Sequence, residues 1–342
     1  MSAAPGLVSI IIVNWNGRAD LQESVESALG QSYSPTEVIV VDNASTDGSR
    51  EWLRAHSRGR FTLVELDRNH GFAGGVNAGI SVARGETIAL LNNDAAAEKD
   101  WIDWLRKPLG DRRVGMVASK ILFYERRDTI DKVGHLLYPD GLNRGRGAGE
   151  VDRCQYDGER DTFFPDGCAA LYRRVMLEDV GLFDEEFFAY GDDAELGIRA
   201  RWKGWNCAFE PRARVYHRHS RSLGKYSPKK AFLVERNRIW VAAKLFPWPL
   251  LLLTPLLTLW RFLWHILSIL ASRGLAGGVA REHGAWELFA TAFRAYGAGV
   301  RGLPSMFAKR REVFRTRVLS SREFYSLLWR YRISARELAF RD

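Results

Sequence analysis

The stretch Glu86-Thr-Ile-Ala-Leu-Leu-Asn-Asn-Asp94 is an apolar run that ends in two amides and a carboxylate. Its composition predicts a buried strand over residues 87–91. Asn92 and Asp94 would then place an amide oxygen and a carboxylate at the carboxyl end of that strand, which suits a hard divalent cation beside a phosphate-bearing ligand. Taken alone, the triplet is more often an ordinary turn, so its meaning depends on the sequence around it.

Strand and helix patterns alternate through the amino-terminal half of the chain. Near-continuous apolar runs predict strands, and each is followed by turn residues and then a helical pattern. These elements occupy residues 8–14, 20–29, 37–42, 49–56, 61–66, a helix that ends near 82, and 87–91. The alternation predicts an α/β fold with a mostly parallel central sheet that carries helices on both faces.

Polar residues gather where these predicted strands end. Ligands on parallel sheets bind at the carboxyl ends of the strands, so these residues form a candidate binding site. The candidates are Asn14, Asp42, Asn69, Gly74, Asn77, Asn92, Asn93 and Asp94.

Two of these features have a structural alternative. A carboxylate such as Asp42 at a buried strand end needs a donor, which a pyrimidine imide N–H can provide, but it can equally cap the turn that follows. Gly71, Gly74 and Gly75 can let the backbone pass close to a ligand, or they can serve only a tight turn or helix–strand packing.

Four motifs in order resemble family 2 glycosyltransferases, closest to the bacterial rhamnosyltransferase-like branch. They are Ser9-Ile-Ile-Ile-Val-Asn-Trp-Asn-Gly17, Val41-Asp-Asn-Ala-Ser-Thr-Asp-Gly-Ser49, Asn69-His-Gly-Phe-Ala-Gly-Gly-Val-Asn77 and Leu91-Asn-Asn-Asp94, within a resemblance over about residues 7–220. The resemblance implies a GT-A nucleotide-sugar fold, an inverting mechanism, and Mg²⁺ or Mn²⁺ on the sugar diphosphate.

The same resemblance implies roles for single residues. Asp42 would accept the imide N–H of uracil or thymine, Asn14 and the 69–77 segment would contact the nucleoside, and Asp94 would bind the metal. Asn92 departs from the family pattern, which has a second carboxylate there, and fewer charged ligands predict weak metal binding without the nucleotide. His217 or His219 could close the site, although histidines in a basic loop are as often simply exposed.

A second group of acidic residues lies in Tyr190-Gly-Asp-Asp-Ala-Glu-Leu-Gly-Ile-Arg-Ala-Arg201. Asp192 and Asp193 open a predicted helix, where the helix dipole favours carboxylates, so a plain acidic helix start is the structural alternative. The stretch also resembles the family's Glu-Asp-x-Asp-Leu motif. On that alignment Asp193 is the general base, Asp192 replaces the Glu, and Glu195 replaces the second Asp.

Composition indicates a compartment and a class of partner. The chain has 342 residues and a net charge of +9, and its three cysteines show no zinc-type spacing, which favours a reducing cytosolic side. Basic charge suits nucleic acid, anionic lipid or phosphorylated substrates. We find no nucleic-acid-binding motif, so no nucleic-acid partner is expected.

The sequence predicts two regions: a glycosyltransferase domain at residues 1–225 and a helical region at 226–342. The segment 246–271 is strongly apolar, with prolines at its start and Arg261 and His265 one turn apart. It predicts a helix or re-entrant hairpin in the membrane interface more than a full span, and the alternative is a buried helix or an oligomer contact. The arginine-rich tail at 309–341 suits anionic membrane lipid. Residues 123–165 are the least readable, and we expect loops or a small hairpin there.

Together these patterns favour an inverting glycosyltransferase. The donor would be a dTDP- or UDP-sugar, with L-rhamnose favoured by the resemblance. The acceptor would be a polyprenyl-diphosphate-linked saccharide, at the cytoplasmic face of the plasma membrane. A nucleotidyltransferase and a non-catalytic sugar-nucleotide-binding membrane adaptor stay open as alternatives, and the product released or the absence of turnover would distinguish them.

Overall fold

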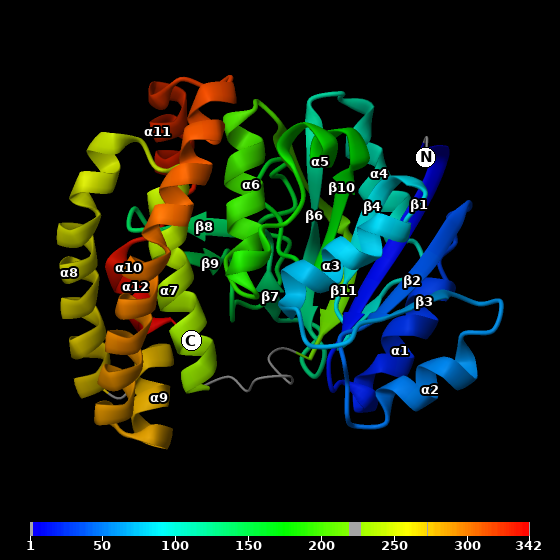
Figure 1. Cartoon of the computed structure of the whole chain (residues 1–342), viewed down its shortest axis with the longest axis horizontal. Helices are drawn as coiled ribbons and strands as arrows, with labels where there is room; N and C mark the ends of the chain where they lie inside the picture. The colour runs from blue at the N-terminus through cyan, green and yellow to red at the C-terminus, as the bar shows by residue number, and fades with distance from the viewer. Residues whose placement is uncertain (1–2, 219–226, 272, 342) are drawn as a thin grey trace.

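The computed structural model describes residues 3–218, 227–271 and 273–341. It consists of an α/β part that carries the sheet and a helical part that begins at residue 228 (Figure 1). The last long strand ends at His217 and the first helix of the helical part begins at Pro228, on either side of the expected boundary. His219 lies outside the described residues.

The elements predicted for the amino-terminal half are confirmed. They are β1 (Ala4–Asn14), α1 (Arg18–Leu29), β2 (Thr36–Asp42), α2 (Ser49–His56), β3 (Thr62–Glu65), α3 (Gly71–Val82) and β4 (Gly85–Leu91). β1 pairs in parallel with both β2 and β4, and Asn14 stands opposite Asp42 in that register. The polar strand ends therefore meet at one edge of the sheet, as the pattern predicts.

The other half of the sheet is mixed rather than parallel. Five strands build it: β5 (Ala95–Ala97), β6 (Val114–Phe123), β7 (Ile130–Lys132), β10 (Ala169–Arg173) and β11 (Asn206–His217). The main path runs β3-β2-β1-β4-β10-β6-β11-β5, and β7 pairs with β6. β10 lies antiparallel to both β4 and β6. A short apolar run such as β10 carries no directional signal, so the sequence could predict this strand but not its orientation.

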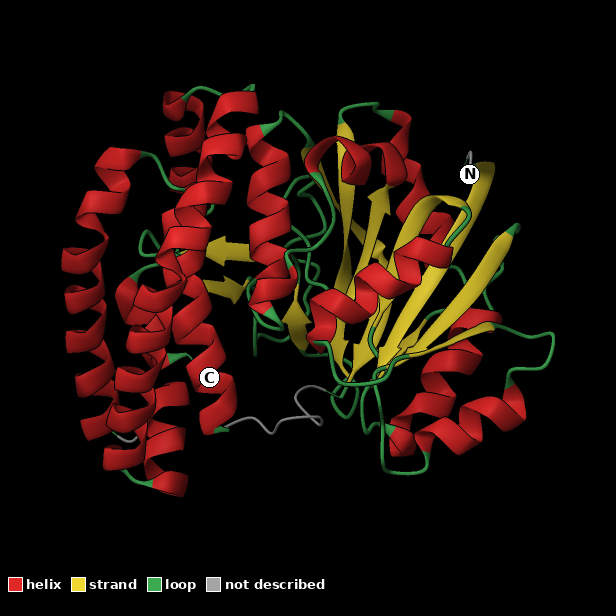
Figure 2. Ribbon diagram, in the orientation of Figure 1, coloured by secondary structure: helices red, strands yellow, loops and turns green. Residues whose placement is uncertain are grey.

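Helices cover both faces of the sheet (Figure 2). Ile10 and Ile12 of β1 pack on one face with α1, whereas Ile11 packs on the other face with α3. This alternation follows from the two-residue period of a strand. Three further helices complete the layers: α4 (Trp101–Arg106), α5 (Arg174–Val180) and α6 (Asp192–Trp202).

Within residues 123–165 the structure has a small hairpin, as expected. Its strands are β8 (His135–Leu137) and β9 (Asn143–Gly145), and they pair antiparallel. Leu137 also exchanges backbone hydrogen bonds with Tyr331 and Ile333 in the carboxyl-terminal region. The hairpin therefore joins the α/β part to the helical part.

The helical part has six helices among the described residues. They are α7 (Pro228–Leu245), α8 (Trp248–Leu270), α9 (Gly274–His283), α10 (Ala285–Thr316), α11 (Ser321–Arg330) and α12 (Ala335–Phe340). Apolar side chains of α7, α8, α10 and α11 share one core cluster with Phe163, Phe164 and Trp202 of the α/β part.

The apolar segment forms one continuous helix, α8, so its prolines do not break it as the sequence suggested. Pro249 lies in the first turn, where a missing N–H costs nothing. Pro255 lies inside the helix and leaves the Leu251 carbonyl without its usual donor. The Thr254 hydroxyl donates to that carbonyl at 2.7 Å, which replaces the lost backbone bond.

Helix α8 is amphipathic, with its polar face turned toward the protein and its apolar face turned outward. Its inward face carries Thr258, Arg261 and Ser268, and Arg261 pairs with Asp140 and Glu235 at 2.8 and 2.9 Å. Its outward face is an apolar stripe with side chains between 54 and 78% exposed: Leu252, Leu256, Leu259, Leu263, Ile266 and Leu270. By length and composition α8 could cross a membrane, and only 17% of its apolar window is buried. The alternative of a helix buried within this chain is therefore wrong.

Candidate active site

One large cavity, of about 1450 Å³, opens at the carboxyl ends of the parallel strands. Several residues predicted from the sequence line it: Asn69, Asn92, Asn93, Asp94, Asp192, Asp193 and His217. Four others are absent from the lining described by the structure: Asn14, Asp42, Gly74 and Asn77. The strand-end pattern therefore located the site, but it did not separate residues that face the ligand from residues that support the wall.

Asp94 and His217 meet at the sheet edge of this cavity. His217 Nε2 lies 3.2 Å from Asp94 Oδ1, and its Nδ1 lies 2.7 Å from Asp131 Oδ2. Both acidic partners are buried. Burial opposes protonation of the imidazole, but Cys168, Asp94 and Asp131 together raise the pKa of His217 well above its usual value.

The wall of the cavity around Asn93 is held by a network of amides and hydroxyls. Asn14 is fully buried, donates to Ser45 Oγ at 3.1 Å, and accepts from Asn93 Nδ2 at 2.8 Å. Gly17 leaves the space that Asn93 fills, since a Cβ there would lie 2.0 Å from the Asn93 amide nitrogen. Asn14 thus orients Asn93 at the cavity wall rather than facing the cavity itself.

Asp42 is fully buried and already has several donors. Its Oδ2 accepts from Ser45 N at 3.1 Å and from Arg50 Nε at 3.1 Å. Arg50 Nε also lies 3.3 Å from Glu65 Oε1, so Arg50 has a second carboxylate within reach. Asp42 Oδ1 in turn accepts from Asn14 Nδ2 at 3.4 Å, so both carboxylate oxygens have partners within the protein.

Gly74, Gly75 and Asn77 of α3 make contacts within the protein. A Cβ on Gly74 would lie 2.7 Å from His70 Cβ, and one on Gly75 would lie 2.5 Å from Val13 Cγ1. Asn77 bonds the backbone at Phe183 in both directions, at 2.9 and 3.1 Å. Asn69 differs, because it lines the cavity and its Oδ1 accepts from Gly71 N at 2.8 Å.

Asp192 and Asp193 open α6 on the opposite side of the cavity, after Gly191 in the left-handed conformation at φ +89°. The Asp193 side chain is 15% exposed and accepts from Ala194 N at 2.7 Å. Asp192 is more deeply buried, and its Oδ2 has no hydrogen-bond partner within the described ranges. Burial raises the pKa of both carboxyls, and the neighbouring Asp193 raises that of Asp192 further, well above its usual value.

Glu195 does not accompany these two aspartates. It is fully buried one turn further along α6, where it pairs with Arg199 at 2.8 Å and Lys244 at 2.7 Å. These partners more than offset desolvation, so the pKa of Glu195 is lowered. The geometry favours a role in anchoring α7 to α6 over the expected support of the base.

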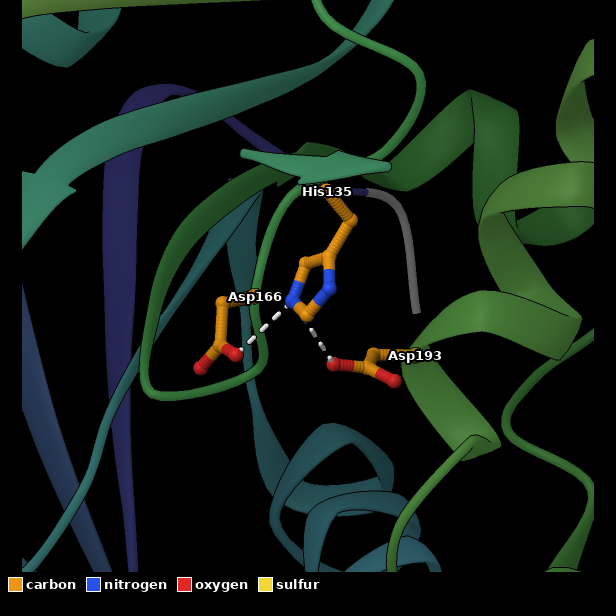
Figure 3. A group of neighbouring side chains, drawn as sticks. All are labelled: His135, Asp166 and Asp193. Atoms are coloured by element: carbon orange, nitrogen blue, oxygen red, sulfur yellow. Dashed lines mark hydrogen bonds and ion pairs between the residues drawn. The ribbon is translucent and has the colours of Figure 1, made fainter. Parts of the chain in front are cut away.

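The structure adds three residues that sequence reasoning missed: Lys132, His135 and Asp166. His135 Nε2 lies 2.9 Å from Asp166 Oδ2 and 3.8 Å from Asp193 Oδ2, so the imidazole stands between two carboxylates (Figure 3). Lys132 Nζ completes the row 2.7 Å from Asp166 Oδ2. His135 stacks on Phe164, with ring centroids 4.9 Å apart, which fixes its orientation.

His135, Asp166 and Asp193 lie close enough together to share a metal ion. However, the Lys132 ammonium already neutralises Asp166, and despite burial the nearby carboxylates raise the pKa of Lys132 above its usual value. Asp166 therefore has a counter-ion without a metal. Asp94 and His217 also face the cavity, beside Asn92, and they could hold a metal once His217 Nε2 gives up its proton and its contact with Asp94.

Comparison with known proteins agrees with this architecture. The family model described as Glycosyl transferase family 2 matches residues 9–181. The succinoglycan biosynthesis protein ExoO of Rhizobium meliloti is 38% identical over 228 residues, which cover 64% of this chain and 62% of ExoO.

A second relative and a solved structure complete the comparison. The Escherichia coli UDP-Glc:alpha-D-GlcNAc-diphosphoundecaprenol beta-1,3-glucosyltransferase WfaP is 30% identical over 143 residues, which cover 41% of this chain and 54% of WfaP. The match thus spans less than two thirds of the length of either relative. The crystal structure of GalNAc-T7 with UDP, GalNAc and Mn²⁺ superposes with a TM-score of 0.57 at 17% identity, over 69% of this chain and 47% of that one.

The matched family segment contains the parallel strands, the Asn92-Asn93-Asp94 wall and Asp166. The structural match confirms the predicted GT-A fold. The chain belongs to glycosyltransferase family 2.

Proposed function

We propose that the chain is an inverting glycosyltransferase that acts in the synthesis of a cell-envelope polysaccharide. The observation that carries this proposal is a single cavity with different chemical groups on two facing walls. Asp94 and His217 stand on the sheet side, and Asp193 stands on the α6 side. A single displacement at an anomeric carbon needs a neutralised leaving diphosphate and a base for the acceptor hydroxyl, and these two walls suit those tasks.

The donor we propose is a dTDP- or UDP-sugar, with L-rhamnose as the sugar favoured by the motif resemblance. Asn69 and Asn93 would contact the nucleotide, and Asp42 would read a uracil or thymine imide N–H after Arg50 shifts to Glu65. UDP in the GalNAc-T7 structure supports a pyrimidine nucleotide.

Asp94 and His217 are the residues that would hold Mg²⁺ or Mn²⁺, with Asn92 as a neutral oxygen ligand. The bound cation would neutralise charge that develops on the leaving diphosphate. Mn²⁺ is the more compatible of the two, because imidazole nitrogen suits transition metals while Mg²⁺ prefers oxygen. Mn²⁺ in the GalNAc-T7 structure supports the same choice.

Asp193 is the group we assign to accept the proton of the acceptor hydroxyl. Its carboxylate borders the cavity, and burial raises its pKa toward the range where a carboxylate is a useful base. Two groups lie beside this carboxylate: His135 Nε2 is 3.8 Å and Gly167 N is 3.4 Å from Asp193 Oδ2.

The acceptor we propose is a saccharide on a polyprenyl diphosphate, at the cytoplasmic face of the plasma membrane. The name of WfaP, which includes a diphosphoundecaprenol acceptor, supports a lipid-linked substrate. The outward apolar stripe of α8 supports a protein that lies on a bilayer, together with anionic lipid at the basic tail.

The test is an assay of the released product with a panel of nucleotide sugars and a membrane lipid extract. Release of a nucleoside diphosphate only when acceptor lipid is present would support the proposal, and EDTA or Asp94→Ala should reduce it by at least about 10²-fold. Release of pyrophosphate from a nucleoside triphosphate would instead support a nucleotidyltransferase. Tight nucleotide-sugar binding without turnover on any lipid fraction would support an adaptor.

A further inference from the structure

The cavity does not end at the candidate active site. Beyond α6 and α7 it continues between helices α8, α9 and α10 of the helical part, and we call this continuation the outer chamber. The residues that line it are Phe262, His265, Ile266, Ile269, Ala276, Val279, Leu288, Phe289, Ala292, Phe293 and Tyr296. All but His265 and Tyr296 are apolar, whereas the inner end is lined largely by acids, amides and bases.

The size of the cavity also separates two binding regions. A pocket for one small ligand usually has about 300–1000 Å³. The whole cavity, at about 1450 Å³, exceeds that range, so it can hold a nucleotide sugar at the strand ends and a second molecule alongside.

Helix α7 connects the two regions. Val234, Arg238 and Val241 recur at helical spacing and line the cavity along one face of α7. On the neighbouring face Asn237 bonds the carbonyl oxygens of Ala189 and Tyr190, immediately before the aspartates that open α6. A ligand along this face of α7 would therefore reach from the outer chamber to Asp193.

The neck between the two regions is cationic. Glu235, Arg238 and Arg261 line the cavity where α7 passes α8, and Asp140, buried behind them, pairs with both arginines. Lys229 and Lys230 line it at the start of α7, beside Trp15, Phe188 and Tyr190. With Arg144, the described wall along α7 carries five cations and one carboxylate, which suits a phosphate group.

The outer end of the chamber opens onto apolar surface. Phe289 and Phe293 are 62 and 74% exposed, and Ile266 belongs to both the chamber lining and the outward stripe of α8. An apolar chain could thus pass from a bilayer into the chamber without crossing a polar surface.

From these three features we propose that the outer chamber binds the isoprenoid chain of the acceptor lipid, with its phosphate at the neck. The inference rests on the proposed function and deepens it by giving the lipid its own site. In this arrangement the saccharide attached to the phosphate points toward Asp193, and the chain leaves between α8 and α10.

The test measures binding of geranylgeranyl monophosphate that carries a terminal diazirine, with excess UDP and Mn²⁺ present. Ala292→Trp fills the chamber from α10, and Ala290→Trp is the matched control on another face of the same helix, outside the described lining. We expect Ala292→Trp to weaken binding at least about tenfold, the effect of losing a few buried methylene contacts, and Ala290→Trp to leave it unchanged. In the wild-type protein, light should attach the probe to peptides of α9 and α10.

Two results would overturn the inference: equal binding by the Ala292→Trp variant, or labelling confined to the outward stripe of α8, which would indicate general membrane contact. Calorimetry with UDP in the wild-type protein and in the Ala292→Trp and Ala290→Trp variants shows whether the variants keep a folded nucleotide site. If wild-type protein binds no nucleoside diphosphate at all, the proposed function fails, and the lipid measurement shows separately whether the chamber binds an isoprenoid.

Discussion

The two adjacent aspartates that open α6 differ in their surroundings, and this difference decides which can act as a base. Asp192 is buried, its Oδ2 has no hydrogen-bond partner among the described residues, and burial together with Asp193 raises the pKa of its carboxyl well above the usual value. Asp193 borders the cavity and has His135 beside it. We therefore expect Asp193→Asn to lower kcat by about 10²–10⁴-fold while nucleotide binding survives.

The control for this prediction is Asp192→Asn, which keeps the shape of the side chain and should lower kcat much less. Steady-state kinetics together with calorimetry of nucleotide binding make the comparison. An inactive Asp192→Asn enzyme beside a nearly normal Asp193→Asn enzyme would assign the base to Asp192 instead.

His135 acts through Asp193, so its effect should appear in the pH profile. Burial raises the pKa of Asp193, electrostatic interaction with His135 and Lys132 lowers it, and Asp166 raises it. Because the base must be deprotonated, removing an interaction that lowers its pKa moves the acidic limb of the kcat/KM profile to higher pH. We expect this shift for His135→Gln and none for His283→Gln, a partly exposed histidine on α9. An unchanged limb with a uniformly lower rate would indicate a purely structural role for His135.

Variants of Asp42 and Arg50 test whether the buried Asp42 carboxylate can exchange Arg50 for the base of a nucleotide. If Arg50 moves to Glu65 when a base enters, Asp42→Asn should weaken UDP binding by about 1–3 kcal/mol, the range for an unpaired buried group. Arg50→Met should then bind UDP as well as the wild type or better, because it leaves Asp42 free for the base. Calorimetry that shows equal losses for both variants, or GDP bound as tightly as UDP, would make Asp42 a structural residue.

At the scale of elements, the amino-terminal half was predictable because its strands and helices carry strong local signals. The apolar runs of β1, β2 and β4 and the caps between them left few alternatives. The acidic start of α6 was equally readable. His135 was not, because it lies on a three-residue strand whose place in the site depends on long-range contacts with Asp166 and Phe164. Asn77 is a related case. It lies within a predicted binding motif, but its amide bonds the backbone of the distant residue Phe183, a contact that no local pattern indicates.

Helix α8 should be the element that holds the protein on a membrane. Its outward leucines are 54 to 78% exposed, while its polar residues face inward. We expect Leu256→Glu with Leu263→Glu to reduce sedimentation with anionic vesicles at least about tenfold, because two apolar contacts become charged. Val82→Glu with Val175→Glu makes the same charge change at exposed apolar sites of the α/β part and should have no such effect. Equal loss in both double variants would attribute binding to net charge alone.

For the whole molecule, the helical part is a structural partner of the catalytic part and not a removable anchor. Trp202 at the end of α6 stacks on Phe324 of α11 with ring centroids 4.5 Å apart, and Lys309 of α10 pairs with Asp184 at 2.6 Å. Deleting everything from Pro247 onward would expose the shared core around Phe163 and Trp202 to water.

We therefore expect the truncated protein to aggregate or to unfold at a clearly lower temperature, rather than to become a soluble active domain. Exposure of several large side chains costs about 1.5–3 kcal/mol each, which is comparable to the whole stability of a domain. Thermal unfolding of the truncated chain against the Leu256→Glu, Leu263→Glu variant separates the two roles, since the latter changes only outward side chains. A truncated chain that melts like the full protein and keeps nucleotide binding would show that the two parts fold independently. In that case the cationic neck would lie between separable domains.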